Sequence, residues 1–438
     1  MIRKKSIRLA GGKSSRLLLA VLLILGSLQP VFAQSSQPST EDQHGKFGGP
    51  DLVPKRIEAD LAAPDTLYEF EFMKPYYDMK DWLYEKTGYL YQMDYFPVYL
   101  KASDSLPGMD DDAAGAVFRF SGFWELLGHG TDSTGTLVYL VEHRHAYKNN
   151  SVSPFGLENL GYAGFSGIPF TDDGWWLTNL FWNQEWQNGF GFAAGFLDVT
   201  DWVDVYAQTS PWTDFHNYAF SIGAGTFDLP DDASLGFAAG GWLIDNVYLI
   251  AGFEDLNSDP TNPWKGFDTF YNDREYFKHI EVGWTMSGQE QYYQDNLHLT
   301  MWQTDERKEI GVKDGWGAFL SFSHTIGRQW LMFTRGGFAE DGGSLLEKSV
   351  SVGGGYAPNG IGAPGSGHQL GFGANWGKPN DALFGTDLDD QYALEVYYRL
   401  QVTRELAITP DVQLLIDPSL NPDEDQIWVG GVRMRVAF

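Results

Sequence analysis

Apolar and polar residues alternate strictly in the last part of the chain. Over 392–403, Tyr392, Leu394 and Val396 fall on one face of the segment, whereas Glu395 and Arg399 fall on the other. A period of two is typical of a β-strand. Glutamate and arginine are costly to bury in a dry core. The pattern therefore favours a strand with lipid on one face and water on the other, as in the wall of a transmembrane β-barrel.

The final segment, 426–438, shows the same alternation. Trp428, Val432 and the terminal Phe438 share one face, and Arg433 and Arg435 share the opposite face. An aromatic residue that closes an alternating strand suits a transmembrane barrel better than a soluble sandwich. We therefore predict that Phe438 is an assembly signal for the barrel assembly machinery.

Short candidate strands, separated by Gly, Asp, Asn and Pro, continue back to residue 89 and include 217–226. They predict an all-β fold, a closed antiparallel transmembrane β-barrel of about 16 strands, because bacterial single-chain barrels have an even number. Our candidates exceed that number by one, so one of them is wrong. The weakest are 89–100, which Pro97 interrupts, and 347–356, which is mostly Gly and Ser.

Three parts are expected along the chain. Residues 1–33 have a basic start, a short apolar core and a small-residue cleavage site, which together predict a cleaved signal peptide. Residues 34–88 are expected to form a periplasmic lead-in, with a short helix over 78–86 that Gly88 caps. The remainder, 89–438, is expected to be the outer-membrane barrel.

Composition agrees with export and with a barrel. The chain has no Cys and a formal net charge of −28 at pH 7. The negative charge excludes nucleic acid as a partner. The acidic loops could bind divalent cations beside lipopolysaccharide, although mere solubility is the favoured explanation of their charge. No stretch after the signal peptide is long and apolar enough for a membrane helix, so a membrane-spanning chain would cross as strands.

Several short motifs occur in a consistent order from about residue 115 to the end. They include Glu142-His143-Arg144-His145, Phe181-Trp182-Asn183-Gln184, Asp255-Leu256-Asn257, Thr409-Pro410-Asp411 and Asn421-Pro422-Asp423. With these motifs the chain resembles the carbohydrate-selective porins of Gram-negative outer membranes, of the glucose-porin type. The resemblance implies a 16-stranded barrel that passes mono- or oligosaccharides by facilitated diffusion, without catalysis and without a cofactor. Monomer and homotrimer both stay open.

Strand parity predicts which side chains line the channel and meet sugars. The predicted lining residues are Arg119, Glu125, Glu142, Arg144, Trp302, Glu395, Tyr397, Arg399, Arg433 and Arg435. Sugar hydroxyls both donate and accept hydrogen bonds, so arginine and carboxylate side chains suit them. The rings of Tyr397 and Trp302 could stack on a pyranose. For any one of these residues, a wall position that merely tolerates water is an equally good interpretation.

Other chemistry has weaker support. Asp255, Asn257 and Asp259 begin like a calcium loop, but Pro260 stands where glycine is needed, so at most a loosely held Ca²⁺ is expected. His143 and His145 share a strand face without an identifiable third ligand. A general porin, a barrel hydrolase and an adhesin remain as alternatives, and solute preference in liposome swelling would separate the selective porin from the general one.

Overall fold

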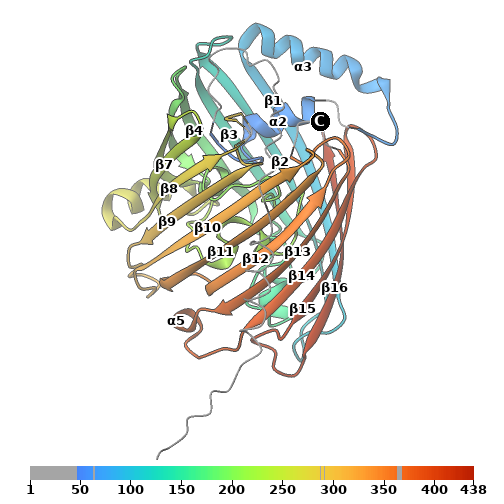
Figure 1. Cartoon of the computed structure of the whole chain (residues 1–438), viewed down its shortest axis with the longest axis vertical. Coiled ribbons are helices and arrows are strands. Elements are labelled where there is room, and N and C mark those ends of the chain that lie inside the picture. The colour runs from blue at the N-terminus through green and yellow to red at the C-terminus, as the bar shows by residue number, and fades with distance from the viewer. Residues whose placement is uncertain (1–46, 63–64, 287, 291, 363–366) are drawn as a thin grey trace, which may run out of the picture. The chain divides into compact units, whose positions relative to one another are not determined.

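Sixteen antiparallel strands form a closed barrel in the computed structural model, which describes residues 47–62, 65–286, 288–290, 292–362 and 367–438 (Figure 1). Each strand pairs with its neighbours in the sequence, and β1 (Tyr89–Ala102) closes the barrel by pairing with β16 (Gln426–Ala437). The predicted fold class is thus confirmed. The expected signal peptide, 1–33, lies outside the described residues.

The other strands are β2 (Asp112–Leu127), β3 (Gly135–Ala146), β4 (Gly174–Glu185), β5 (Phe190–Leu197), β6 (Ser234–Ile244), β7 (Val247–Asp255), β8 (Tyr276–Thr285), β9 (Asn296–Thr304), β10 (Gly315–Ile326), β11 (Trp330–Asp341), β12 (Leu346–Tyr356), β13 (Gln369–Pro379), β14 (Gln391–Gln401) and β15 (Leu406–Ile416). The α-helices are α2 (Val53–Leu61), α3 (Lys74–Thr87), α4 (Gly266–Asp268) and α5 (Asp381–Phe384). Single helical turns are η1 (Glu71–Met73), η2 (Phe155–Asn159), η3 (Val199–Asp201), η4 (Tyr218–Phe220), η5 (Ile222–Gly225), η6 (Pro263–Lys265) and η7 (Thr269–Asp273). None of the described helices has the length and apolar character needed to cross a membrane.

The alternation in the sequence corresponds to the two faces of the wall. In β14, Leu394, Val396 and Tyr398 point outward and are exposed, whereas Glu395 and Tyr397 point into the barrel and are buried. The same division holds in β2, where Phe120 and Trp124 are exposed outside the barrel and Arg119 is buried inside it. Outward apolar side chains suit lipid, and inward polar ones suit an aqueous lumen.

The wrong candidate strand is 217–226. This segment forms η4 and η5, because the Asn217 side chain accepts a hydrogen bond from the Ala219 N–H at 2.9 Å and both Gly223 and Ala224 have positive φ. Its apolar side chains are spaced like those of a strand, but they pack inside the barrel rather than against lipid. The two candidates that looked weakest, 89–100 and 347–356, correspond to β1 and β12.

Loop lengths assign the two ends of the barrel. Short turns such as 245–246, 327–329 and 402–405 share one rim, and long loops such as 147–173 and 198–233 share the other. The connections 286–295 and 357–368 are longer exceptions at the first rim. Short periplasmic turns and long outer loops are usual for such barrels, so we call the first rim periplasmic. Phe438 and α3 lie at this rim, where the Phe438 N–H donates to the Met93 carbonyl at 2.9 Å.

The lead-in contains more structure than the sequence indicated. The predicted helix over 78–86 forms as α3, and Gly88 ends it in the left-handed conformation, with its N–H donating to the Tyr84 carbonyl. A second helix, α2, was not expected, because its sequence lies in a polar stretch that resembles a flexible tail.

Candidate functional site

A long loop narrows the lumen. Residues 198–233, between β5 and β6, fold inside the barrel, and most of them are buried. We call this segment the constriction loop. Aromatic side chains of the loop pack against inward-facing aromatic side chains of the wall, for example Tyr206 and Phe215 against Phe333, and Phe227 against Phe319. The loop is therefore a packed part of the protein interior.

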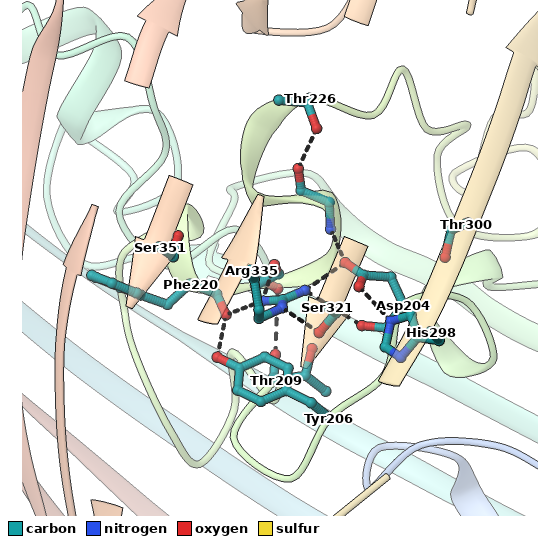
Figure 2. A network of polar contacts seen from close by, with 12 residues as sticks. Asp204, Tyr206, Thr209, Phe220, Thr226, His298, Thr300, Ser321, Arg335 and Ser351 are labelled. Atoms are coloured by element: carbon teal, nitrogen blue, oxygen red, sulfur yellow. Dashed lines mark hydrogen bonds and ion pairs between the residues drawn. The ribbon is translucent and has the colours of Figure 1, made fainter. Parts of the chain in front are cut away.

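A buried ion pair fixes the middle of the constriction loop (Figure 2). Arg335, from β11, forms an ion pair with Asp204 and donates to the carbonyl oxygens of Phe220 at 3.1 Å and Ser221 at 3.0 Å. Its guanidinium also lies 4.1 Å from the centre of the Tyr206 ring. Both charged side chains are fully buried, so the mutual pairing offsets much of their loss of hydration. Arg335 thereby joins two distant parts of the loop to the wall.

Asp204 is held from several sides. His298, on β9, places Nε2 2.8 Å from an Asp204 carboxylate oxygen, and the Gly223 N–H donates to the other oxygen at 2.6 Å. The backbone N–H of Asp204 donates to Glu281, on β8, at 2.7 Å. Asp204 has a positive φ of 55°, a conformation that aspartate adopts at modest cost. Sequence reasoning did not identify Asp204, His298 or Arg335, since their relation depends on contacts between distant segments.

Two of the predicted lining residues hold the backbone of the constriction loop. The Glu395 carboxylate accepts the N–H groups of residues 216–217 at 2.6 and 2.9 Å. Arg433 donates to the carbonyl oxygens of Pro211 at 2.9 Å and Asp214 at 2.7 Å. Both side chains are buried inside the barrel, as the alternation of the strands predicted, and both form hydrogen bonds with the backbone of the loop.

The two aromatic residues predicted to stack on sugars are covered by the constriction loop. The Tyr397 ring meets Phe215 edge-on at 5.0 Å, and its hydroxyl donates to the Asp214 carboxylate at 2.8 Å. The Trp302 ring lies 6.1 Å from Phe227. Tyr397 and Trp302 are only 1% and 3% exposed. A sugar could stack on either ring only after the loop had moved.

A second cluster of charged side chains connects strands β2 and β3 to the constriction loop. The Nε atom of Arg119 lies 2.8 Å from the Glu142 carboxylate, and Arg144 contacts both Glu142 and Asp232, the latter at 2.7 Å. The Arg119 guanidinium stacks on Trp212, with its central carbon 3.9 Å from the ring centre. The structure thus brings together three of the predicted lining residues.

Glu125 lies apart from these groups. Its carboxylate accepts a hydrogen bond from the Tyr84 hydroxyl of α3 at 3.2 Å and lies 2.6 Å from His129 Nδ1. Both partners belong to the periplasmic rim, so the structure does not bring Glu125 to the constriction.

Helix α2 lies inside the barrel on the periplasmic side of the constriction loop. Arg435 forms ion pairs with Asp60 of α2 and with Asp94 of β1, and Arg56 of α2 pairs with Asp94 at 2.7 Å. The apolar side of the helix packs against inward-facing Leu90, Phe123, Val138, Leu140 and Phe181. Apolar residues on the inner wall, which an open water-filled lumen would not explain, are thus covered by α2.

A cavity of ≈ 120 Å³ remains between α2, the constriction loop and strands β14–β16. Its charged lining residues are Asp51, Arg56, Asp60, Asp214, Arg399, Arg404, Arg433 and Arg435. Arg399 also donates to the Gly367 carbonyl at 2.9 Å. Burial raises the pKa of the Asp214 carboxyl, and the nearby Arg399 partly offsets that effect. We call this space the charged cavity. It can hold a group of water molecules or a small polar solute.

The predicted calcium segment is engaged in local turns. Asp255 accepts hydrogen bonds from Thr269 and from the Asn257 N–H, and Asp259 accepts from Thr261. Within the described part of the chain, no group of three or more His, Cys, Asp or Glu residues is arranged to hold a metal ion. A loosely held calcium ion stays a prediction.

These features are those of an outer-membrane porin. The barrel has 16 strands and an apolar outer face, its turns are short at one rim, and a long loop folds into its polar lumen. The family model described as "Carbohydrate-selective porin, OprB family" matches residues 155–438, and the chain belongs to this family. The resemblance seen in the sequence is thereby confirmed, and the protein is a channel for passive, sugar-selective diffusion.

One solved porin structure shares the fold, and two others were compared with the chain. The high-pH structure of OprB from Pseudomonas putida has a TM-score of 0.61 and 14% identity, and the match covers 83% of this chain and 97% of that one. The low-pH structure of the same porin has a TM-score of 0.49 and 13% identity, over 84% and 98% of the two chains. A mutant of the Rh. blastica porin has a TM-score of 0.49 and 12% identity, over 80% and 100%. No curated protein sequence matches the chain.

Proposed function

We propose that sugars are selected at the constriction formed by the constriction loop, α2 and strands β14–β16, as they diffuse through the lumen. The observation that supports this most directly is the charged cavity, where arginine and aspartate side chains from all three parts face one space. Guanidinium groups donate and carboxylates accept, so together they can replace the hydration of sugar hydroxyls.

Passage also requires that no single contact be too strong. A channel conducts when a solute binds well enough to enter and weakly enough to leave. Arg433 and Arg435 already hold protein partners, namely loop carbonyl groups and two carboxylates. A sugar would therefore share these donors rather than capture them, which favours weak and reversible binding.

The family and the fold indicate a channel. The hydrogen bonds of Glu395 also do not suit a carboxylate that catalyses glycoside hydrolysis. A carboxylate used in glycoside hydrolysis must be placed to transfer a proton or to attack the sugar. Both oxygens of Glu395 instead accept backbone N–H groups of the constriction loop. A structural role for this carboxylate follows.

We also propose how the chain reaches and occupies the membrane. Residues 1–33 would direct export in a Gram-negative bacterium, and the barrel assembly machinery would recognise the last strand through Phe438. Phospholipid and lipopolysaccharide would surround the apolar outer face. A homotrimer remains one proposed assembly state, and acidic outer loops that include Asp255, Asn257 and Asp259 could hold Ca²⁺ loosely.

Liposome swelling tests the selectivity. Proteoliposomes carrying the mature protein should swell faster in glucose or maltose than in a non-sugar of similar size. Arg399→Gln, which changes the charged cavity, should reduce this preference, whereas Lys278→Gln, at the outer end of β8 with an exposed ion pair to Asp305, should retain it. Equal swelling rates for every solute in the unmodified protein would favour a general porin instead.

A further inference from the structure

The lead-in exposes a cluster of large apolar side chains outside the barrel. The exposed residues are Leu67, Tyr68, Phe70, Phe72, Met79 and Trp82, with Phe72 74% and Trp82 58% exposed. Phe70 and Phe72 contact each other, with 6.0 Å between the ring centres. Large exposed apolar patches mark protein or membrane interaction sites. We call residues 67–87 the rim segment.

Contacts at both of its ends fix the rim segment to the periplasmic rim. The Leu67 and Tyr68 N–H groups donate to the carbonyl oxygens of residues 401–402, where β14 ends. At the other end, the indole N–H of Trp124 on β2 donates to the Thr87 carbonyl at 2.9 Å. The segment therefore follows the rim across several strands, and Figure 1 shows α3 running along this edge of the barrel.

Helix α3 has three distinct sides. Tyr77, Lys80 and Tyr84, at spacings of three and four residues, face the barrel. Asp81 and Glu85 lie on a second, charged side. The remaining exposed side carries Met79 and Trp82, together with Lys86, one turn beyond Trp82. The apolar side thus faces away from the barrel, with the exposed Asp78 at its border, four residues before Trp82.

At the rim the helix contacts both faces of the wall. Tyr84 packs against the inward-facing Phe123, with 5.9 Å between the ring centres, and Lys80 reaches the lipid-facing surface. The Lys80 ammonium lies 5.5 Å from the centre of the Tyr91 ring. Tyr91 points outward from β1 and lies beside Phe120, which is exposed on the outer face of β2. Outward Trp and Tyr residues near a barrel rim mark the level of the lipid headgroups. The exposed aromatic side chains of the rim segment continue this belt.

We infer that the rim segment is an interfacial anchor that binds phospholipid in the periplasmic leaflet of the outer membrane. Phe72, Met79 and Trp82 would enter the boundary between headgroups and acyl chains, where amphipathic helices bind. Lys86, on the same side of the helix as Met79 and Trp82, would reach lipid phosphates. Phospholipid is the favoured occupant because the surface is continuous with the lipid-facing belt.

The absence of cysteine in the chain allows a direct test by spin labelling. Single variants Phe72→Cys and Met79→Cys would carry nitroxide labels on the apolar side, and Asp81→Cys would carry a matched label on the charged side of the same helix. Each variant is reconstituted in vesicles of phosphatidylethanolamine and phosphatidylglycerol and used only if it conducts like the unmodified protein. Collision rates with oxygen, which enters lipid, and with a water-soluble nickel chelate are then measured.

Labels at 72 and 79 should collide with oxygen severalfold more often, relative to the nickel chelate, than the label at 81. Equal and high nickel accessibility at all three sites would show that the segment lies in water and would overturn the inference. Protection of 72 and 79 from both reagents would also overturn it, because a second copy of the barrel, not lipid, would then cover the surface.

Discussion

The constriction loop and helix α2 both occupy the lumen, but the wall holds them in different ways. The loop forms hydrogen bonds or ion pairs with side chains on five strands spread around the barrel, namely Arg144, Glu281, Arg335, Glu395 and Arg433. The polar anchors of α2 that meet the wall gather at β1 and β16, where Arg435 and Asp94 bind it. The comparison indicates that the loop is a permanent part of the barrel interior, whereas α2 can be released while the barrel stays folded.

The largest expected effect comes from removing the centre of the loop's attachment. Arg335→Ala leaves the fully buried Asp204 without its cation, and breaking a buried pair in this way typically costs about 3–5 kcal/mol. The free energy of unfolding, followed by tryptophan fluorescence in urea, should fall by that amount.

Lys278→Ala is the matched control for this variant. It removes an exposed ion pair with Asp305, and such pairs are worth about 0–1 kcal/mol. An Arg335 variant that is no less stable than this control would show that the loop is not held as described.

The second prediction concerns α2 and should show mainly in conductance. Arg435→Met removes ion pairs to Asp60 and Asp94, and hydrogen bonds to charged groups contribute about 1.5–3 kcal/mol. Because the ion pair with Asp60 joins α2 to β16, its loss should loosen the helix, and the single-channel conductance should rise. Arg435→Lys, which keeps the charge but loses the planar fork, should give an intermediate conductance. If Arg435→Met lowered the unfolding free energy as much as Arg335→Ala, the proposed difference between the two segments would be wrong.

The third prediction separates sugar binding from attachment of the loop. Arg399→Ala, alone or with Arg433→Ala, should weaken sugar block of the current by about tenfold, which corresponds to the loss of about 1.4 kcal/mol of binding free energy. Arg433→Ala should in addition raise the conductance, since it frees the carbonyl groups of residues 211 and 214. Unchanged discrimination in the double variant would remove both arginines from the selective site.

The smallest effect is expected outside the lumen. Trp82→Ala changes α3 on its exposed side, away from α2 and the charged cavity. Single-channel conductance and sugar block should therefore match those of the unmodified protein. A clear change in either quantity would mean that the rim segment is coupled to the channel.

Much of the wall was predictable from the sequence because a strand between lipid and water must alternate. The inward position of Glu395, Arg399, Arg433 and Arg435 follows from that period alone. The same rule failed at 217–226, where alternate apolar residues pack within the lumen instead of facing lipid. Alternating apolar residues show that one side of a segment is removed from water. They do not show whether lipid or protein covers that side.

The contacts of the site could not be predicted in the same way. Glu395 binds the backbone of residues 216–217, which are 179 and 178 positions away, and Arg435 binds Asp60, which is 375 positions away. The sequence around one partner contains no feature that identifies the other partner. Helix α2 was missed for a related reason: its few apolar residues, Val53, Ile57 and Leu61, occur among charges and become meaningful only against Leu90 and Phe123 of the wall.

Planar-bilayer conductance of the refolded mature protein, titrated with glucose, maltose and a non-sugar of similar size, tests sugar selection at the constriction most directly. Concentration-dependent block of the open-channel current by the sugars alone is the predicted result, with weaker block in Arg399→Ala. Steady conductance that no solute changes, or equal block by the non-sugar, would contradict selection at the charged cavity.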